Sequence, residues 1–259
     1  MGGFRILVAD EHPIFRVGLC LLLGSRESWE VCGAAADGRE AVEKCRQLKP
    51  DLLILDICMP KLNGLDAARQ ILKENPDQVV LILTAVDSEQ VVRDCLDAGV
   101  RGWIFKSDAT EDLMAAVETL QRRKTMFSAR VSDLILEGFK RNRLGPPAAS
   151  VPKLSPRERE VVQLVSEGKA SKEVATILNV TVATAETHRS NILRKLKLHS
   201  VAELVLYAVR NEIVHVQLSG VPRFLNPTEE RSRPRPTFGY AALPKPGNGR
   251  ADVVPQDAN

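Results

Sequence analysis

The sequence predicts an α/β domain built on a parallel sheet, followed by a smaller all-helical domain. Three observations lead to this prediction. Short apolar runs alternate with helical patterns over the first 123 residues, as expected for strands joined by right-handed helical crossovers. Glycine and proline then gather around residues 145–152, where neither a helix nor a strand would persist. Four short segments with apolar residues at helical spacing come after them.

Five apolar runs mark the expected strands of the first domain. The most informative run is 52–55, because four consecutive apolar residues lead directly into the carboxylate of Asp56, and Pro60 follows shortly after. A continuous apolar run of this length suits a strand that is buried on both faces. The five expected strands cover residues 4–9, 30–34, 52–55, 79–84 and 101–106.

Capping residues and prolines mark the expected helices between these strands. His12 and Pro13 open the first, since proline suits the first helical turn. Asp37 precedes Glu40 at the spacing of a capping box, and Pro50 ends that helix. The remaining helices are expected over 64–74, from 87–90 to Gly99, and from 110 onward.

Polar side chains gather at the carboxyl ends of these strands, which meet at one edge of a parallel sheet. They are Asp10, Glu11, Asp56, Thr84 and Lys106. Clustered carboxylates repel one another and require a cation, and hard oxygen ligands favour Mg²⁺. A metal-screened Asp56 could attack phosphorus, while Lys106 and Thr84 contact the phosphoryl oxygens. Taken alone, Asp56 is better explained as a strand-ending residue with a local hydrogen bond. The polar residues at the other strand ends reverse this preference.

The first domain resembles the receiver domain of two-component response regulators. The matching motifs are Asp10-Glu11, Asp56 with Met59-Pro60, Leu83-Thr84-Ala85 and Gly102-Trp103-Ile104-Phe105-Lys106. The resemblance implies a flavodoxin-like sheet of five parallel strands in the order 2-1-3-4-5. It also implies that a sensor histidine kinase phosphorylates Asp56. The Mg²⁺ ion would be bound by Asp10, Glu11, Asp56 and the backbone carbonyl of Cys58.

Trp103 occupies the position where this family usually has Tyr or Phe, the ring that rotates inward when Thr84 is recruited. An indole is bulkier and its N–H requires a partner, so both a switching role and a fixed packing role stay open. The Cys58 thiol, two residues after Asp56, is expected to influence water access at the phosphoryl group rather than to sense oxidants.

The sequence of the second domain predicts a helix-turn-helix unit. Ser155, Pro156 and Glu158 mark the start of its first helix, as N-cap, first helical residue and capping-box partner. Its second helix starts at Ser171, and a tight turn over 179–181 leads into a third helix over 182–197. The fourth helix, over 200–213, retains an apolar face.

This second segment resembles the DNA-binding domain of the NarL/LuxR class. The matching residues are 154–160, 167–169, 172–175 and 187–196. The resemblance places the third helix in the major groove of DNA and uses the fourth helix for dimer contact; a lone core helix is the alternative. The expected DNA-binding residues are Lys172, Glu186, Thr187, Ser190, Asn191, Arg194 and Lys195, of which the three basic residues are expected to contact phosphates.

Glu186 departs from the family, in which lysine is usual at this position. A carboxylate there would be repelled by phosphates but could accept a hydrogen bond from a cytosine amine. The histidines His12, His188 and His199 are expected to be structural. From residue 217 onward the chain is rich in proline and arginine, which is typical of disordered segments.

Composition limits the function classes. No apolar run approaches the roughly 18 residues of a membrane span, and neither a signal peptide nor a metal-binding cysteine spacing is found. We therefore expect a cytoplasmic protein with no membrane partner. We also expect no enzymatic turnover, because nothing in the sequence indicates a substrate pocket. The expected domains are a receiver (1–124), a linker (125–153), a LuxR-type helix-turn-helix domain (154–216) and a disordered tail (217–259).

The leading functional prediction is a DNA-binding response regulator that forms a homodimer on paired half-sites when Asp56 is phosphorylated. Two alternatives stay open. The first is a DNA binder that does not depend on phosphorylation. The second is a kinase-docking or phosphate-sink module whose DNA binding is impaired at Glu186.

Overall fold

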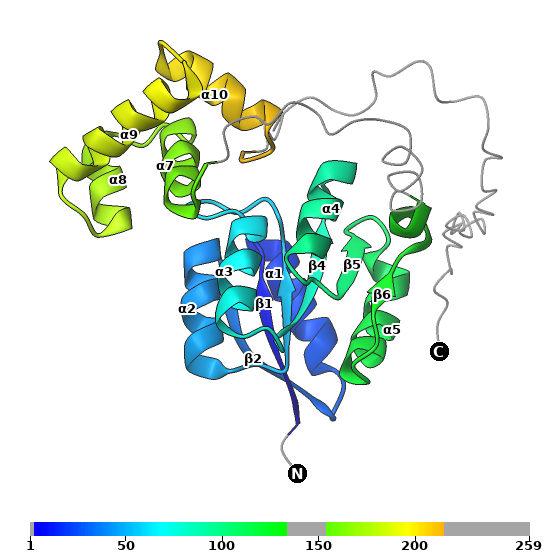
Figure 1. Ribbon diagram of the computed structural model, residues 1–259. Coiled ribbons are helices and arrows are strands. Elements are labelled where there is room, and N and C mark those ends of the chain that lie inside the picture. The colour runs from blue at the N-terminus through cyan, green and yellow to red at the C-terminus, as the bar shows by residue number, and fades with distance from the viewer. Residues whose placement is uncertain (1–2, 134–153, 215–259) are drawn as a thin grey trace, which may run out of the picture. The chain divides into compact units, whose positions relative to one another are not determined.

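The computed structural model describes residues 3–133 and 154–214, which belong to one compact unit of the chain (Figure 1). The glycine- and proline-rich part of the expected linker and the expected tail lie outside the described residues. The description that follows therefore covers a sheet domain and a helical domain.

The sheet domain contains one fully parallel sheet, as the sequence predicts. The predicted order of the first five strands is confirmed, because the full order is β2-β1-β3-β4-β5-β6. The central strands β3 and β4 are buried at every residue, in agreement with their continuous apolar runs. The strands are β1 (Phe4–Ala9), β2 (Trp29–Ala35), β3 (Leu52–Leu55), β4 (Val79–Thr84), β5 (Gly102–Phe105) and β6 (Met126–Phe127).

The sixth strand is a correction to the five-strand prediction. Met126 pairs with Gly102, and Phe127 pairs with Trp103, so that β6 extends the sheet beyond β5. These two residues fall in the range 125–153, which the sequence predicts to be a linker. A helical turn over 129–133 follows, and its Val131 is fully buried in the same core as Trp103. A strand of two residues is too short for an alternating pattern to predict.

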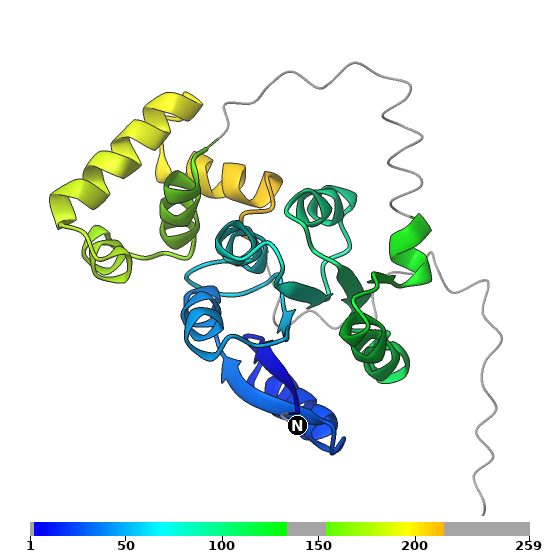
Figure 2. The same cartoon turned by 60° about the horizontal axis from the view of Figure 1, so that its bottom comes forward.

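Helices cover both faces of the sheet (Figures 1 and 2). One core contains apolar residues of α2, α3 and α4, and the other contains residues of α1 and α5. The helices are α1 (Pro13–Gly24), α2 (Gly38–Leu48), α3 (Gly64–Glu74), α4 (Glu89–Asp97) and α5 (Ala109–Gln121). All the polar strand ends predicted to converge therefore lie at the carboxyl edge of a sheet that is shielded on both sides.

Capping side chains start three of these helices. Asp37 accepts a hydrogen bond from the backbone N–H of Glu40, as its spacing predicts, and Ser88 accepts one from Val91. Asn63 is the N-cap of α3 and accepts one from the backbone N–H of Asp66. These caps fix where the loops at the carboxyl edge end and the helices begin.

The helical domain consists of α7 (Pro156–Ser166), α8 (Ser171–Leu178), α9 (Val182–Leu196) and α10 (Val201–Arg210). Ser155 and Glu158 form the predicted capping box. Asn179 ends α8 in the left-handed conformation, and Thr181 caps α9, which gives the predicted short turn between them. The core of this domain is built from one apolar stripe of each helix. No described helix is long and apolar enough to span a membrane.

Candidate phosphoacceptor site and nucleic-acid interface

Asp56 lies directly after β3 at the carboxyl edge of the sheet, and two neighbouring strands supply its charged partners. Asp10 follows β1, and Lys106 follows β5. The Lys106 Nζ lies 2.7 Å from Asp56 Oδ2 and 2.8 Å from Asp10 Oδ2. Asp10 is 1% exposed and Asp56 2%, so two buried carboxylates share one ammonium. The site retains an excess of negative charge.

The pKa values of this cluster reflect that imbalance. Burial raises the pKa of Asp56, and the nearby Asp10 adds to the effect, while Lys106 and the Thr84 hydroxyl oppose it. Burial alone would lower the pKa of Lys106, but the carboxylates of Asp56 and Asp10 outweigh it and raise the pKa. The Nζ of Lys106 also lies 4.9 Å from the centroid of the Phe15 ring, a cation–π contact that fixes its position.

The donor set of this cluster fits a divalent cation. Ligand atoms of Asp10, His12 and Asp56 lie within 4.8 Å of one another. Excess carboxylate charge and oxygen donors favour Mg²⁺. Glu11, a predicted ligand, is half-buried and is not part of this group, whereas His12, expected to be structural, is. The His12 Nδ1 lies 3.3 Å from Asp10 Oδ1. The sequence gives no signal for this proximity beyond the closeness of the two residues in the chain.

Thr84 and Trp103 both lie in the interior. Thr84 ends β4 fully buried, and its hydroxyl accepts a hydrogen bond from the backbone N–H of Val86. Trp103 is 1% exposed and packs edge-on against Phe105. Its indole N–H has no hydrogen-bond partner among the residues that the structure describes. The ring therefore occupies an inward position, packed in the core that contains α4 and Val131.

The Cys58 thiol has the properties expected of an unreactive cysteine. Burial, together with the negative charges of Asp56 and Glu11, raises its pKa to about 12. Its thiolate would be scarce at neutral pH, so the environment disfavours a role in sensing oxidants. The backbone N–H of Cys58 points to Asp56 Oδ1 at 3.3 Å.

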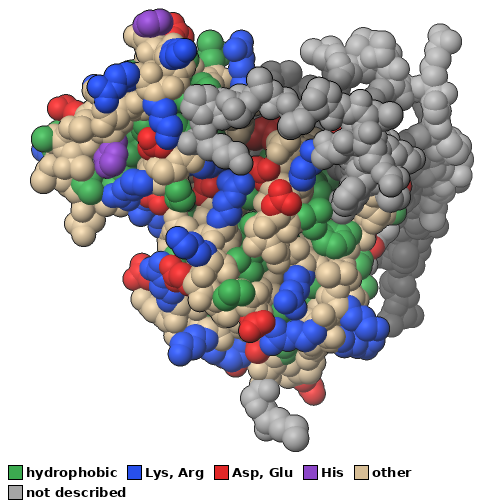
Figure 3. Space-filling model, viewed as in Figure 1, with side chains coloured by type: hydrophobic (Ala, Val, Ile, Leu, Met, Phe, Trp, Pro, Cys, Tyr) green, Lys and Arg blue, Asp and Glu red, His purple; other side chains and the backbone are tan. Residues whose placement is uncertain are grey.

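All seven predicted DNA-binding residues lie on exposed parts of α8 and α9. They are Lys172, Glu186, Thr187, Ser190, Asn191, Arg194 and Lys195. On the opposite side of α9, Ala185 and Ile192 are buried in the core, which fixes the rotation of the helix. Lysine and arginine side chains recur over the face of this domain that Figure 3 shows.

Two of these residues have partners within the domain. The Lys195 Nζ lies 2.7 Å from Glu158 Oε2 at the start of α7, so its ammonium is drawn toward that helix. The Arg194 guanidinium donates to Asn191 Oδ1 at 2.8 Å, one turn earlier on α9. Glu186 is exposed in the first half of α9, where a phosphate would meet a negative charge.

Comparisons with known proteins place both domains. A family model described as a response regulator receiver domain matches residues 6–118, and one described as bacterial regulatory proteins of the luxR family matches 152–208. The response regulator protein VraR of Staphylococcus aureus is 33% identical over 210 residues, which cover 81% of this chain and 98% of VraR. This chain is a response regulator of the LuxR family.

Solved structures of other LuxR-family regulators agree with this assignment. RcsB of Salmonella typhimurium is 26% identical, with a TM-score of 0.53, over 82% of this chain and 99% of RcsB. A LuxR-family two-component response regulator from Aurantimonas sp. SI85-9A1 is 28% identical, with a TM-score of 0.51, over 53% of this chain and 99% of that protein. A further RcsB structure shows that protein bound to the promoter rprA with the phosphomimetic BeF3⁻ (27% identity, TM-score 0.50, 79% and 98% coverage). The family comprises DNA-binding transcription regulators.

The raised pKa of Asp56 leads to a prediction for this response regulator without metal. Because the folded pKa lies above the ordinary 3.8, the folded state binds more protons, and stability falls as the pH rises through that interval. Asp56→Asn should therefore raise the free energy of unfolding at pH 7 by about 1–2 kcal/mol. Urea unfolding from pH 3.5 to 7 should show that the difference in free energy of unfolding between Asp56→Asn and the wild type becomes smaller at lower pH. Added Mg²⁺ should reduce this difference at pH 7. The exposed Asp77→Asn is the matched control; an equal effect there would contradict the explanation.

Glu186→Lys tests whether this position faces the DNA backbone. The change should strengthen non-specific binding, and the slope of log K against log salt should steepen by about 0.9 if one more phosphate is contacted. Fluorescence anisotropy on an unrelated duplex at several salt concentrations measures it. Glu43→Lys makes the same charge change on α2 of the receiver domain and should leave the slope unchanged. Equal slopes for wild type and Glu186→Lys would show that residue 186 lies away from the phosphates.

Proposed function

We propose that this response regulator is switched by a phosphoryl group that Asp56 accepts from a sensor histidine kinase. The observation that carries the proposal is the buried Asp56, held with Asp10 by the single ammonium of Lys106. A carboxylate oxygen of Asp56 would attack phosphorus, and the bond from phosphorus to the kinase imidazole nitrogen would break. Lys106 lies where its ammonium would stabilise the negative charge of the transferred oxygens.

Mg²⁺ would be held by Asp10, Asp56 and the carbonyl of Cys58, with Glu11 and His12 as the further candidates at the same edge. When bound, it would neutralise the carboxylates and the phosphoryl oxygens together. The Thr84 hydroxyl accepts a hydrogen bond from the backbone N–H of Val86, and its own proton would be donated to a phosphoryl oxygen. We assign Trp103 a fixed packing role, because turning a fully buried indole outward would leave a large cavity.

In the helical domain, α9 would enter the major groove. The candidates for base contacts are Thr187, Ser190 and Asn191. The candidates for phosphate contacts are Lys172, Arg194 and Lys195. Glu186 would face either a cytosine amine or the phosphate backbone of the DNA. Exposed apolar side chains support a homodimer on paired half-sites: Val201 is 42% and Leu206 55% exposed on α10. Ile14 and Leu21 of α1, 90% and 71% exposed, offer a second apolar surface in the receiver domain.

We propose that the receiver domain extends from residue 1 to residue 133, beyond the predicted limit at 124, because β6 and Val131 belong to its sheet and core. A linker would then join it to a DNA-binding domain over 154–216, and a tail would cover 217–259. The chain would act in the cytoplasm, where it could meet both DNA and the catalytic part of a kinase. A second candidate, a kinase-docking module with impaired DNA binding, is favoured only by the exposed carboxylate of Glu186. Retention of a specific DNA site separates the two.

The switch is tested by molar mass from light scattering with Mg²⁺, before and after addition of beryllofluoride as a mimic of the aspartyl phosphate. The wild type should double in mass and bind its operator more tightly, whereas Asp56→Asn should do neither. Ile14→Lys, at a position that is 90% exposed, shows whether α1 forms part of the dimer surface. A wild type that stays monomeric would exclude dimerisation as the response, and a mutant that doubles in mass would exclude Asp56 as the trigger.

A further inference from the structure

A cavity lies at the amino edge of the sheet, the edge opposite Asp56. Its volume is about 410 Å³, and it is enclosed by the last turns of α2 and α3 and by the segments that lead into β3 and β4. This volume falls within the range of cavities that bind small molecules. The cavity shares no lining residue with the phosphoacceptor site, so its purpose has to be sought in its own side chains.

The floor of this cavity is apolar and preformed. Val42 and Ile71 are buried members of the core that packs α2 and α3 on this face of the sheet, and Cys45 belongs to the same core. Burial raises the pKa of the Cys45 thiol to about 11, so the thiol stays protonated and uncharged at neutral pH. A ligand with an apolar body would therefore gain free energy by leaving water for this floor.

One polar side chain, that of Gln78, lines the cavity and is 5% exposed. Its Nε2 donates to the backbone carbonyls of Pro50 and Val79 at 3.1 and 3.2 Å, so both amide protons are used. Its Oε1 accepts from the Cys45 thiol at 3.6 Å, and a thiol is a weak donor. Because an amide oxygen can accept two hydrogen bonds, Gln78 offers a ligand a buried acceptor at a fixed position.

An ion pair joins the two helices at the rim of the cavity. Arg46 of α2 donates to both carboxylate oxygens of Glu74 of α3, at 2.7 and 2.5 Å. This contact lowers the pKa of Glu74 and raises that of Arg46, so both stay ionised at neutral pH and their charges cancel. The two side chains are 56% and 46% exposed, and such a surface pair contributes little to stability. The pair can therefore separate to admit a ligand.

The remaining charges around the cavity also offset one another. Lys49, exposed at the end of α2, is the third charged lining residue. Two helices end at this cavity, α2 at Leu48 and α3 at Glu74, and the carboxyl end of a helix carries a partial negative charge of about half a unit. Since these two helix ends oppose the Lys49 ammonium, the cavity favours neither an anion nor a cation.

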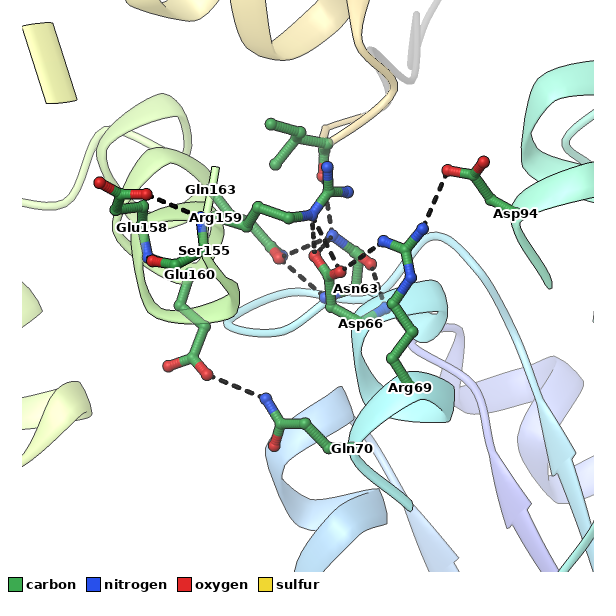
Figure 4. Close-up of polar contacts among 11 residues, drawn as sticks. Asn63, Asp66, Arg69, Gln70, Asp94, Ser155, Glu158, Arg159, Glu160 and Gln163 are labelled. Carbon is green, nitrogen blue, oxygen red and sulfur yellow. Dashed lines mark hydrogen bonds and ion pairs between the residues drawn. The ribbon is translucent and has the colours of Figure 1, made fainter. Parts of the chain in front are cut away.

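The described part of the helical domain supplies no side chain to the lining of this cavity. Gln163 and its neighbours on α7 contact the receiver domain at Asn63, Asp66 and Gln70, in the N-cap and first two turns of α3 (Figure 4). The cavity is lined by the last turn of the same helix. A ligand can therefore reach it in the full chain without displacing α7.

We propose that this cavity is a binding site for an uncharged, mostly apolar small molecule that carries one N–H or O–H donor, as an indole or a phenol does. The ring of the ligand contacts Val42 and Ile71, and its donor bonds to Gln78 Oε1. The site gives the receiver domain a chemical input that does not involve Asp56. Because the ligand binds the folded state, it also raises the midpoint of thermal unfolding.

The test titrates the ¹⁵N-labelled full chain with indole and, separately, with indene, the hydrocarbon of the same shape that lacks the N–H. Chemical-shift changes of the amide signals measure both affinities. Indole should cause saturable changes at the ends of α2 and α3 and in the side-chain amide of Gln78. It should bind on the order of fivefold more tightly than indene, since one neutral hydrogen bond contributes about this factor.

Cys45→Leu places extra carbons in the cavity and should abolish indole binding without lowering the midpoint of thermal unfolding, because the added carbons fill empty space. Cys20→Leu makes the same change on α1 and should leave indole binding unchanged. A wild type without saturable shifts, equal affinities for indole and indene, or unchanged indole binding by Cys45→Leu would each overturn the proposal. The comparison of the two ligands on the wild type decides even if Cys45→Leu fails to fold.

Discussion

The structure depends on the Lys106 ammonium, which holds two buried carboxylates at the carboxyl edge of the sheet. Asp10 and Asp56 follow adjacent strands, and burying two carboxylates in the interior is costly unless a cation pairs with them. The apolar strands fix where these groups meet, and the helices on both faces exclude water from the sheet. One positive charge for two carboxylates leaves the site short of cationic charge, which is the condition for binding a metal ion and a phosphoryl group together.

Much of the fold could be predicted because the decisive signals are local. The run 52–55, the N-cap Asp37 and the capping box at Ser155 determined strand and helix limits to within a residue or two. The sixth strand escaped prediction because Met126 and Phe127 pair through the backbone and have no periodicity of their own. Within the site, the convergence of Asp10, Asp56 and Lys106 could be predicted from the parallel topology alone.

What the sequence could not show are contacts between segments far apart in the chain. Gln163 has the appearance of a solvent-facing helix residue, and only the approach of the Met59–Asn63 segment buries it. His12 was expected to be structural because nothing in the sequence shows that its ring lies beside Asp10. The predicted roles of the exposed residues on α9 require a DNA partner and stay predictions.

The central claim is that Asp56 is the residue that accepts the phosphoryl group. Intact-protein mass spectrometry after incubation with Mg²⁺ and a small phosphoryl donor such as acetyl phosphate tests it most directly. The account predicts the added mass of one phosphoryl group on the wild type and none on Asp56→Asn, with loss of the group in mild base, as expected of an acyl phosphate. A wild type that gains no mass, or an Asp56→Asn variant that gains as much, would contradict the account.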